Sequence, residues 1–275
     1  IIYIFFIKKI ILMKNLKIVI SGYKGFIGRN LSRFLKSKKI KIYKYKKNLE
    51  IHEGKIDCFI HLEFYISKNK NRYLNKNLKK MDEVLYFCNR YKIPLIFPST
   101  SITHSIENKK IEKLNKYQQA KILCEKKIEN FFLKKNINFK ILRLSNVYGN
   151  DPNSYGVIPD LIKKMRRKKI VLKNYNDYRD FIYIEDVNLI IYKLLKIKKT
   201  LKINICYGKS IKIKDLANKI KKIFKYKCKI ILSRKFRYSK NQINSPNNSN
   251  LKKVINVHNL KSINLGLNIV KKAFI

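Results

Sequence analysis

Apolar positions follow two alternating patterns along the first half of the chain. Short apolar runs are separated by longer segments whose apolar residues recur at helical spacing. The runs predict strands at Lys17–Ser21, Ile40–Tyr45, Asp57–Leu62, Ile93–Phe97 and Phe139–Leu144. The longer segments predict helices at Phe26–Leu35, Leu74–Arg90 and Ile111–Leu133. Strands that alternate with helices predict an α/β fold, with a doubly wound parallel sheet covered by helices on both faces.

The pattern changes after Gly149. A turn-rich loop at Asn150–Gly156 precedes predicted helices at Val157–Lys168 and Ile213–Phe224, and Asn241–Asn250 predicts a polar loop. We therefore expect a sheet-bearing domain at residues 13–149 and a smaller α/β lobe at residues 150–275.

The first twelve residues are apolar but are interrupted by Lys8 and Lys9. A membrane-spanning helix needs about 20 apolar residues, and a secretory signal needs basic residues first and a small-residue cleavage site after. Neither pattern is present. A strand follows Met13 almost at once, so we expect Met13 to be the start and residues 1–12 to be a non-native upstream stretch.

The charge is extreme but has a compositional explanation. The 275 residues include 65 Lys and Arg against 17 Asp and Glu, a formal net charge of +48. Of the basic residues 55 are Lys, and there are 45 Ile but only three Ala. Lys and Ile have A/T-rich codons, so drift in an AT-rich genome accounts for the bias. Phosphate-binding proteins favour Arg, and these lysines are spread along the whole chain. The charge therefore does not predict nucleic-acid binding.

Composition also limits the classes of protein to which the chain can belong. A hydrophobic share of 45% and an aromatic share of 12% exclude a disordered chain. The five cysteines are scattered and form no Cys-x-x-Cys pair, which predicts reduced thiols, a cytoplasmic location and no metal site. They are Cys58, Cys88, Cys124, Cys206 and Cys228.

Three of the eight glycines fall within seven residues, between a predicted strand and a predicted helix. Gly22, Gly25 and Gly28 have the spacing of a dinucleotide-binding turn. The first glycine allows the tight turn, the second lets the backbone approach a pyrophosphate, and the third lets helix and strand pack closely. The amino terminus of the helix then faces the pyrophosphate. This motif predicts a Rossmann-type cofactor domain.

The choice between NAD and NADP depends on the end of the second strand. An acidic residue there binds the ribose hydroxyls of NAD, but the stretch Tyr43–Lys47 contains no acid, and the first one is Glu50. Arg29, directly after the last glycine, also suits a 2′-phosphate. Because one residue in five is lysine, NAD and NADP both stay open, with these features favouring NADP.

Tyr117 and Lys121 form a Tyr-x-x-x-Lys pair on one face of a predicted helix. An ordinary phenol has a pKa of about 10, and a nearby ammonium lowers it towards the range needed for acid–base catalysis. Ser99, Thr100 and Ser101 follow a predicted strand, at the sheet edge where open parallel sheets carry their active sites. A hydroxyl there could bond a substrate oxygen beside the phenol. A helix-capping or turn role is the alternative.

Several segments together resemble a known family. They are KIVISGYKGFIGRNL, DCFIHL, FPSTSITH, YQQAK, LRLSNVYG and RDFIYIEDV, in this order. The chain resembles the extended short-chain dehydrogenases/reductases, in particular the nucleotide-sugar epimerase/dehydratase group. The resemblance covers residues 14–272 and implies a Rossmann-type sheet with a small C-terminal substrate-binding lobe. It also implies a nucleotide-diphosphate sugar as substrate and a homodimer.

The resemblance assigns roles residue by residue. It implies that Tyr117 is the acid/base, Lys121 its partner and ribose ligand, and Thr100 the catalytic hydroxyl, with Ser99 in that role if the alignment shifts by one residue. The implied cofactor residues are Gly22, Gly25, Phe26, Ile27, Gly28, Arg29, Asp57, Leu62, Asn77 and Ser145. The implied substrate residues are Ser99, Asn146, Arg179 and Arg237.

The chain departs from the family pattern in three places. Glu63 and Phe64 stand where the family usually has small residues, and His104 stands in place of a usual Tyr. Only 11 residues separate Tyr45 from Asp57, which predicts a shortened third-strand region.

The residues after Thr100 narrow the reaction. Dehydratases of the group follow it with Asp-Glu, and fucose-synthase-like enzymes have a Cys two positions on, whereas this chain has Ser101 and Ile102. A nucleotide-sugar 4-epimerase or 4-ketoreductase remains. The alternatives from other classes are a non-catalytic cofactor binder and an RNA-binding relative of the same fold.

Overall fold

A computed structural model of the chain describes residues 16–46, 49–50, 55–66, 70–103, 110–233, 243–244, 246–256 and 259–274. The predicted upstream stretch 1–12, His104 and Arg237 lie outside these ranges. The chain divides into two compact units. The first comprises Ile1–Arg143 and Ile191–Ile203, and the second Leu144–Ile190 and Asn204–Ile275.

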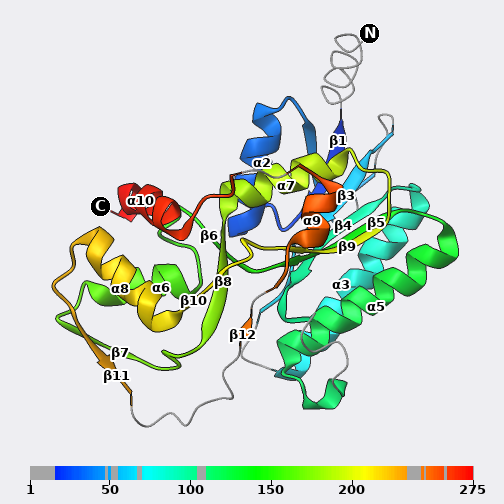
Figure 1. The fold of residues 1–275 in the computed structure, drawn as a ribbon. Coiled ribbons are helices and arrows are strands. Elements are labelled where there is room, and N and C mark those ends of the chain that lie inside the picture. Colours follow the sequence, from blue (N-terminus) through cyan, green and yellow to red (C-terminus); the bar gives the residue numbers. More distant parts are fainter. Residues whose placement is uncertain are drawn as a thin grey trace. The chain divides into compact units, whose positions relative to one another are not determined.

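The first unit is built on a six-stranded sheet with the strand order β2-β1-β3-β4-β5-β9 (Figure 1). The strands are β1 (Lys17–Ser21), β2 (Lys41–Lys44), β3 (Cys58–His61), β4 (Leu95–Thr100), β5 (Phe139–Leu144) and β9 (Leu201–Ile205). The β1–β2, β1–β3 and β3–β4 pairs are parallel. This confirms the predicted Rossmann-type α/β class. Within the described ranges β2 forms the edge of the sheet, and the region predicted to be shortened after it lies partly outside these ranges.

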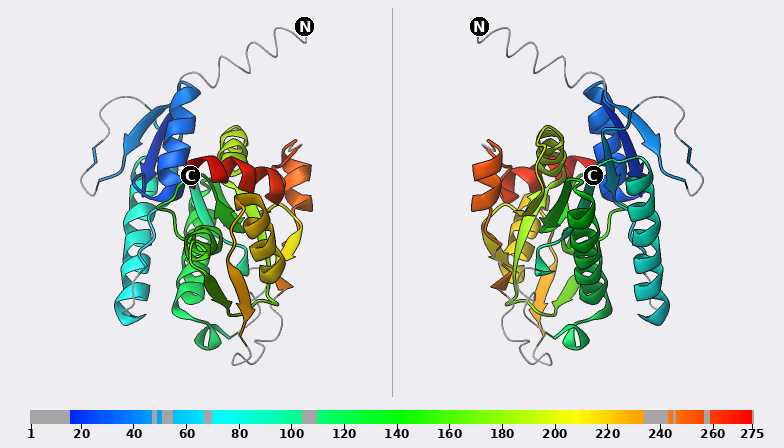
Figure 2. Two further views of the ribbon diagram at one scale, coloured as in Figure 1. Left: turned by 90° about the vertical axis from the view of Figure 1, so that its left-hand side faces the viewer. Right: turned by 90° about the vertical axis from the view of Figure 1, so that its right-hand side faces the viewer.

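Helices flank this sheet. They are α2 (Phe26–Ser37), α3 (Lys70–Arg90), α5 (Lys116–Lys135) and the end of α7 (Ile184–Leu195), which belongs to this unit from Ile191 onward. α3 and α5 pack side by side (Figure 1). α2 lies against β2, as Figure 2 shows for the blue elements. The Phe34 ring of α2 meets the Tyr192 ring of α7 edge-on, with centroids 5.9 Å apart.

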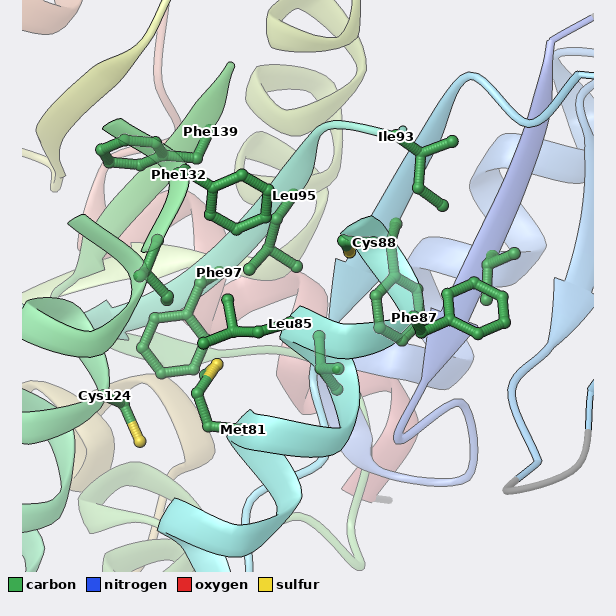
Figure 3. Close-up of a cluster of buried hydrophobic side chains, with 14 of the residues drawn as sticks. Met81, Leu85, Phe87, Cys88, Ile93, Leu95, Phe97, Cys124, Phe132 and Phe139 are labelled. Atoms are coloured by element: carbon green, nitrogen blue, oxygen red, sulfur yellow. The ribbon is translucent and has the colours of Figure 1, made fainter. Parts of the chain in front are cut away.

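The core of this unit forms where α3 and α5 pack on the strands. Met81 and Leu85 of α3, Phe97 of β4 and Cys124 of α5 are buried and point towards one another (Figure 3). Phe132 of α5 and Phe139, next to it, close one end of the cluster. This core fixes the end of β4 against the start of α5, and both elements carry predicted site residues.

The second unit holds a small mixed sheet. β8 (Tyr178–Tyr183) pairs with β6 (Asn146–Tyr148), β10 (Ser210–Lys212) and β12 (Ile243–Asn244). β7 (Lys169–Leu172) pairs with β11 (Lys229–Leu232). The helices are α6 (Val157–Met165), α8 (Ile213–Phe224), α9 (Ser249–Val254) and α10 (Ile263–Phe274).

Two predicted helix boundaries were wrong for local reasons. The helix predicted from Ile111 begins only at Lys116, because Asn115 caps it and a short 3-10 turn, η1 (Ile111–Lys113), precedes it. The helix predicted to reach Lys168 ends at Met165, because Lys169 already pairs in β7.

The strand predicted at Ile93–Phe97 begins at Leu95 and continues through Thr100, so the hydroxyl cluster belongs to the strand itself. The polar segment Asn241–Asn250, predicted as a loop, contains β12 and the first residues of α9.

Candidate active site

The glycine turn between β1 and α2 is so tightly packed that two of its glycines leave no room for a side chain. Gly22 has a φ of 66°, and a Cβ atom there would lie 2.5 Å from the backbone nitrogen of Glu63. A Cβ at Gly28 would lie 2.2 Å from the Gly22 carbonyl oxygen. Gly25 is exposed, and a Cβ there would come only within 3.3 Å of that oxygen. Gly22 and Gly28 thus close the turn, while Gly25 leaves bare backbone at its surface.

The helix after the turn offers an anion site. Gly25 is the N-cap of α2 and supplies no capping side chain. Phe26, Ile27 and Gly28 form the first turn, where backbone N–H groups have no acceptor inside the helix. These amides, with the positive end of the helix dipole, suit a phosphate group.

Two cations border the turn. The Arg29 guanidinium donates a hydrogen bond to the Lys24 carbonyl at 2.6 Å. At the end of β2, the Lys44 ammonium lies 5.4 Å from the centre of the Tyr23 ring. Positive charge therefore lies on both sides of the turn.

The structure separates Asp57 from Leu62. The Asp57 carboxylate accepts a hydrogen bond from the Lys17 backbone nitrogen at 2.8 Å, at the amino-terminal edge of the sheet. Leu62 follows β3 at the opposite edge, and its N–H donates to the Ser21 carbonyl at 3.3 Å. Leu62 therefore lies beside the glycine turn, whereas Asp57 is not brought together with the other predicted cofactor residues.

A buried histidine that sequence reasoning did not single out supports the turn. His61 Nδ1 lies 2.6 Å from Ser21 Oγ, and the ring stacks between Phe59 and Phe97. Burial lowers the pKa of His61 to about 3, so the ring is neutral. The Ser21 hydroxyl oxygen also accepts the Glu63 backbone N–H at 3.4 Å. This ties β1 to the loop after β3.

The predicted catalytic residues Thr100, Tyr117 and Lys121 are brought together by β4 and α5. Thr100 is the last residue of β4, and Tyr117 lies in the first turn of α5. The Asn115 side chain fixes the start of α5 by accepting the Gln118 backbone N–H at 3.0 Å. Burial raises the pKa of Tyr117, and a side-chain hydrogen bond to Thr100 offsets part of that rise.

Lys121 lies one helical turn beyond Tyr117 and is 6% exposed. Its ammonium donates to the Pro98 carbonyl at 3.0 Å and lies 3.7 Å from the centre of the Phe64 ring and 4.7 Å from that of Phe97. Burial lowers the pKa of Lys121 to about 8, although nearby Cys124 and Glu125 favour the charged form.

A buried polar network lies next to this pair. The Arg143 guanidinium donates to the Glu125 carboxylate at 2.7 Å. The Ser99 hydroxyl donates to the same carboxylate, and the Thr103 hydroxyl lies 2.9 Å from it and 2.7 Å from the Thr100 carbonyl. Ser99 is therefore turned towards Glu125, and Thr100 is the hydroxyl that meets Tyr117.

The Asn77 side chain bonds the backbone of the loop after β3 instead of facing an open surface. Its side-chain oxygen accepts the Tyr65 N–H at 2.8 Å, and its amide nitrogen donates to the carbonyls of Tyr65 and Tyr73 at 3.0 and 2.9 Å. With these three bonds Asn77 fixes the backbone next to Phe64.

The predicted residues of the second unit fall into two groups. Ser145 follows β5 and donates its N–H to the Ile205 carbonyl at 3.0 Å. The Asn146 side chain donates to the Asp180 carbonyl at 2.9 Å, and the Asp180 carboxylate accepts the Gly208 N–H at 2.7 Å. The Asn146 bond fastens the start of β6 to β8, and the Asp180 carboxylate fastens β8 to the loop after β9 (Leu201–Ile205).

Arg179, the residue before Asp180 on β8, lines a cavity of about 360 Å³ in this unit. Its guanidinium is paired with the Asp177 carboxylate at 3.0 Å. Lys164, Leu161, Lys173 and Asn174 also line the cavity. The cavity combines apolar walls with cationic groups, two of which, Arg179 and Lys164, are paired with carboxylates that also line it.

A family comparison agrees with this geometry. The NAD dependent epimerase/dehydratase family model matches residues 18–206, which include the glycine turn, Thr100, Tyr117 and Lys121. The chain belongs to this family.

Individual relatives of this epimerase/dehydratase-family chain are more distant. Over 120 residues it is 35% identical to "Putative UDP-glucose 4-epimerase" of Methanocaldococcus jannaschii, an alignment that spans 42% of this chain and 39% of that protein. Among solved structures, UDP-glucose 4-epimerase of Thermotoga maritima with UDP-glucose matches with a TM-score of 0.80 and 19% identity, covering 94% and 98% of the two chains. RMD of Pseudomonas aeruginosa complexed with NADPH matches with a TM-score of 0.78 and 15% identity, covering 94% and 99%.

In its described ranges, this family member offers neither a metal-binding cluster nor a membrane-spanning helix. In the described ranges, no group of three His, Cys, Asp or Glu side chains is arranged to hold a metal ion. No helix within those ranges has the length and apolar character needed to cross a membrane.

Proposed function

We propose that this protein is an NAD(P)-dependent nucleotide-sugar 4-epimerase or 4-ketoreductase in which Tyr117 transfers the proton. The observation that carries the proposal is a phenol that bonds a hydroxyl and stands one helical turn before a buried lysine. The Tyr117 hydroxyl bonds Thr100, and Lys121 follows Tyr117 by one turn of α5. A hydroxyl, a phenol and an ammonium on adjacent elements form an acid–base site for an alcohol or ketone.

The glycine turn fits a dinucleotide. Gly22 and Gly28 are packed against backbone, so they hold the turn in one shape, and Gly25 presents exposed backbone at the start of α2. The amides of the first helical turn would bind the pyrophosphate. Arg29 and Lys44 beside the turn favour NADP over NAD, and the complex of the Pseudomonas aeruginosa protein with NADPH is consistent with this preference.

The proposed chemistry divides between cofactor and protein. The nicotinamide ring, when bound, supplies or accepts a hydride at C4. In the reducing direction, Tyr117 donates its phenolic proton to the carbonyl oxygen of the sugar as that oxygen becomes a hydroxyl. In the oxidising direction Tyr117 takes the proton back. Thr100 holds the same sugar oxygen, and the Lys121 charge stabilises the phenolate.

The substrate proposal rests on the cavity of the second unit. Arg179 and Lys164 are paired there with Asp177 and Asp160, and Lys173 adds a third cation that suits a nucleotide diphosphate. The Thermotoga maritima enzyme was solved with UDP-glucose, which supports a nucleotide sugar here. The residues after Thr100 favour epimerisation or ketoreduction, because Ser101 and Ile102 supply no carboxylate for dehydration.

The first test is cofactor binding. NADPH and NADH are titrated separately by fluorescence at moderate salt, with the wild-type chain and with Gly25→Asp. An Asp at an N-cap stabilises a helix, so loss of binding in this variant reports a blocked and negatively charged turn rather than unfolding. Saturable binding that Gly25→Asp abolishes supports the site, and absence of binding by both cofactors rejects the oxidoreductase proposal.

The second test is turnover. A panel of nucleotide sugars and their 4-keto forms is incubated with the preferred cofactor. Epimerisation without net cofactor consumption identifies an epimerase, and stoichiometric oxidation of NAD(P)H identifies a reductase. Tyr117→Phe should bind the cofactor normally and lose turnover by about 100-fold or more.

A further inference from the structure

The aromatic ring of Phe64 covers the two residues that the proposed chemistry needs exposed. It lies 3.7 Å from the Lys121 ammonium, measured to the ring centre, and meets the Tyr117 ring edge-on at 5.9 Å. No residue of this size is usual at this place in the resembled family. The position of the Phe64 ring over these two residues therefore indicates a functional role for it.

The three groups nearest the Lys121 ammonium, from Pro98, Phe97 and Phe64, are buried to different extents. A lysine ammonium has three N–H donors. One donates to the Pro98 carbonyl, and the faces of Phe97 and Phe64 lie nearest after it. Pro98 and Phe97 are buried in β4, whereas Phe64 is half-buried at the edge of the sheet. A ligand that arrives from solvent to bond Lys121 therefore meets the Phe64 ring first.

The backbone that carries Phe64 is fixed on both sides. Before it, the N–H groups of Leu62 and Glu63 donate to the carbonyl and the hydroxyl of Ser21. After it, Asn77 holds both polar backbone groups of Tyr65. Movement of Phe64 must therefore come from rotation of its side chain rather than from displacement of the loop.

Space for that rotation exists beside the ring. A cavity of about 480 Å³ borders Phe64 in the same unit and is lined in part by Glu63, Tyr65, Asn77 and Lys80. Tyr65 and the neighbouring Ile66 are exposed, so the cavity lies near solvent. The Phe64 ring also packs against the core and meets the Tyr73 ring edge-on at 6.1 Å, so rotation into the cavity exchanges these contacts for the cavity lining.

We propose that Phe64 is a side-chain gate, which covers Lys121 and rotates away when the ribose next to the nicotinamide binds there. The inference rests on the proposed function, because that function makes Lys121 a ribose ligand. The gate sets cofactor affinity. The ring faces the ammonium in a cation–π contact, and a ribose hydroxyl must replace that contact.

The chain offers a direct reporter for this movement because it contains no Trp. Phe64→Trp would hold the one indole of the protein, and Tyr86→Trp, on α3 at a side chain that is 68% exposed, is the matched control. The probes are ADP-ribose, which carries the distal ribose, and ADP, which lacks it, or their 2′-phosphates if the protein selects NADP. None of them absorbs at the wavelengths of Trp emission.

We expect ADP-ribose to shift the emission of Phe64→Trp to longer wavelength, ADP to leave it unchanged, and neither probe to move Tyr86→Trp. We also expect Phe64→Ala to bind ADP-ribose about two- to thirtyfold more tightly than wild type, with ADP affinity unchanged, because the lost contact is of cation–π strength. Phe64→Leu, which keeps apolar bulk without an aromatic face, should bind between the two. Thermal unfolding of each variant checks that it is folded.

The outcomes separate the gate from the proposed function. If wild type binds the cofactor, but Phe64→Ala leaves ADP-ribose affinity unchanged or weaker and the Phe64→Trp emission does not move, the gate is rejected and the function stands. If only Phe64→Ala binds, the ring closes the site fully and the gate is supported. If neither wild type nor Phe64→Ala binds any nicotinamide cofactor, the proposed function is rejected and the gate with it.

Discussion

Glu125 and Arg143 form an ion pair inside the sheet unit, with the guanidinium Nη2 atom 2.7 Å from the Oε2 atom and both side chains at most 6% exposed. Glu125 lies one helical turn after Lys121 on α5, and Arg143 lies on β5. The same carboxylate accepts the Ser99 hydroxyl of β4. One acidic side chain thus joins the two elements that carry Thr100, Tyr117 and Lys121.

We predict that Glu125→Gln strongly destabilises the protein, because it leaves the buried Arg143 charge without its partner. Breaking a buried pair in this way costs about 3–5 kcal/mol. Asp160→Asn is the matched control. Asp160 pairs with Lys164 at the same 2.7 Å, but both side chains are more than half exposed, so the loss should be below about 1 kcal/mol. Urea unfolding measures both, and equal losses would contradict the role of burial.

The glycine turn gives a second prediction, in which two similar changes differ strongly in their effect on stability. Gly28→Ala places a methyl group 2.2 Å from the Gly22 carbonyl and must distort the turn, so we expect a loss of several kcal/mol. Gly25→Ala has an ordinary φ of −72° and 3.3 Å to its neighbour, so its stability should change by less than about 1 kcal/mol. If the turn binds a pyrophosphate, Gly25→Ala should still weaken cofactor binding. Calorimetric unfolding and cofactor titration of both variants provide the measurements.

How much of this site the sequence predicts depends on whether a feature is local. The glycine turn is local, since three glycines, a strand and a helix specify it within a few residues, and the structure has the predicted elements there. Thr100, Tyr117 and Lys121 came together as expected because each stands at a recognisable place on its element. The start of α5 was missed although Asn115 and Gln118 carry a capping pattern, which a search for that signal would have found.

Other features depend on tertiary packing. Phe64 reaches Lys121 across 57 residues of sequence, and no periodicity indicates which ring will face that ammonium. The position of Asp57 could have been predicted from the sequence. Asp57 precedes strand β3, whereas the glycine turn follows strand β1. In a parallel sheet these two places lie at opposite edges.

A third prediction concerns stability at acid pH. Burial holds the pKa of His61 at about 3 in the folded protein, against about 6.5 in an unfolded chain. The unfolded state therefore binds more protons between these values. The stabilisation is complete above about pH 6.5 and declines by about 1.4 kcal/mol per pH unit as the pH falls towards 4. His61→Gln removes the titrating group, so urea unfolding at pH 7 and pH 5 should show a smaller pH dependence for the variant. An unchanged difference would mean that His61 is not the group responsible.

The last prediction links the buried ammonium to catalysis. Burial lowers the pKa of Lys121 to about 8, so the free protein loses this charge as the pH rises through about 8. A neutral Lys121 no longer stabilises the Tyr117 phenolate or bonds a ribose as a cation, and we expect kcat/KM to fall above that pH, since this ratio reports groups of the free enzyme. Lys121→Arg keeps its charge at every accessible pH and should remove this limb, at the cost of a lower plateau because the planar group does not match the position of the ammonium. Phe64→Ala admits water to Lys121 and should move the limb to higher pH. A pH profile that is the same in all three proteins would show that the titration of Lys121 does not limit the reaction.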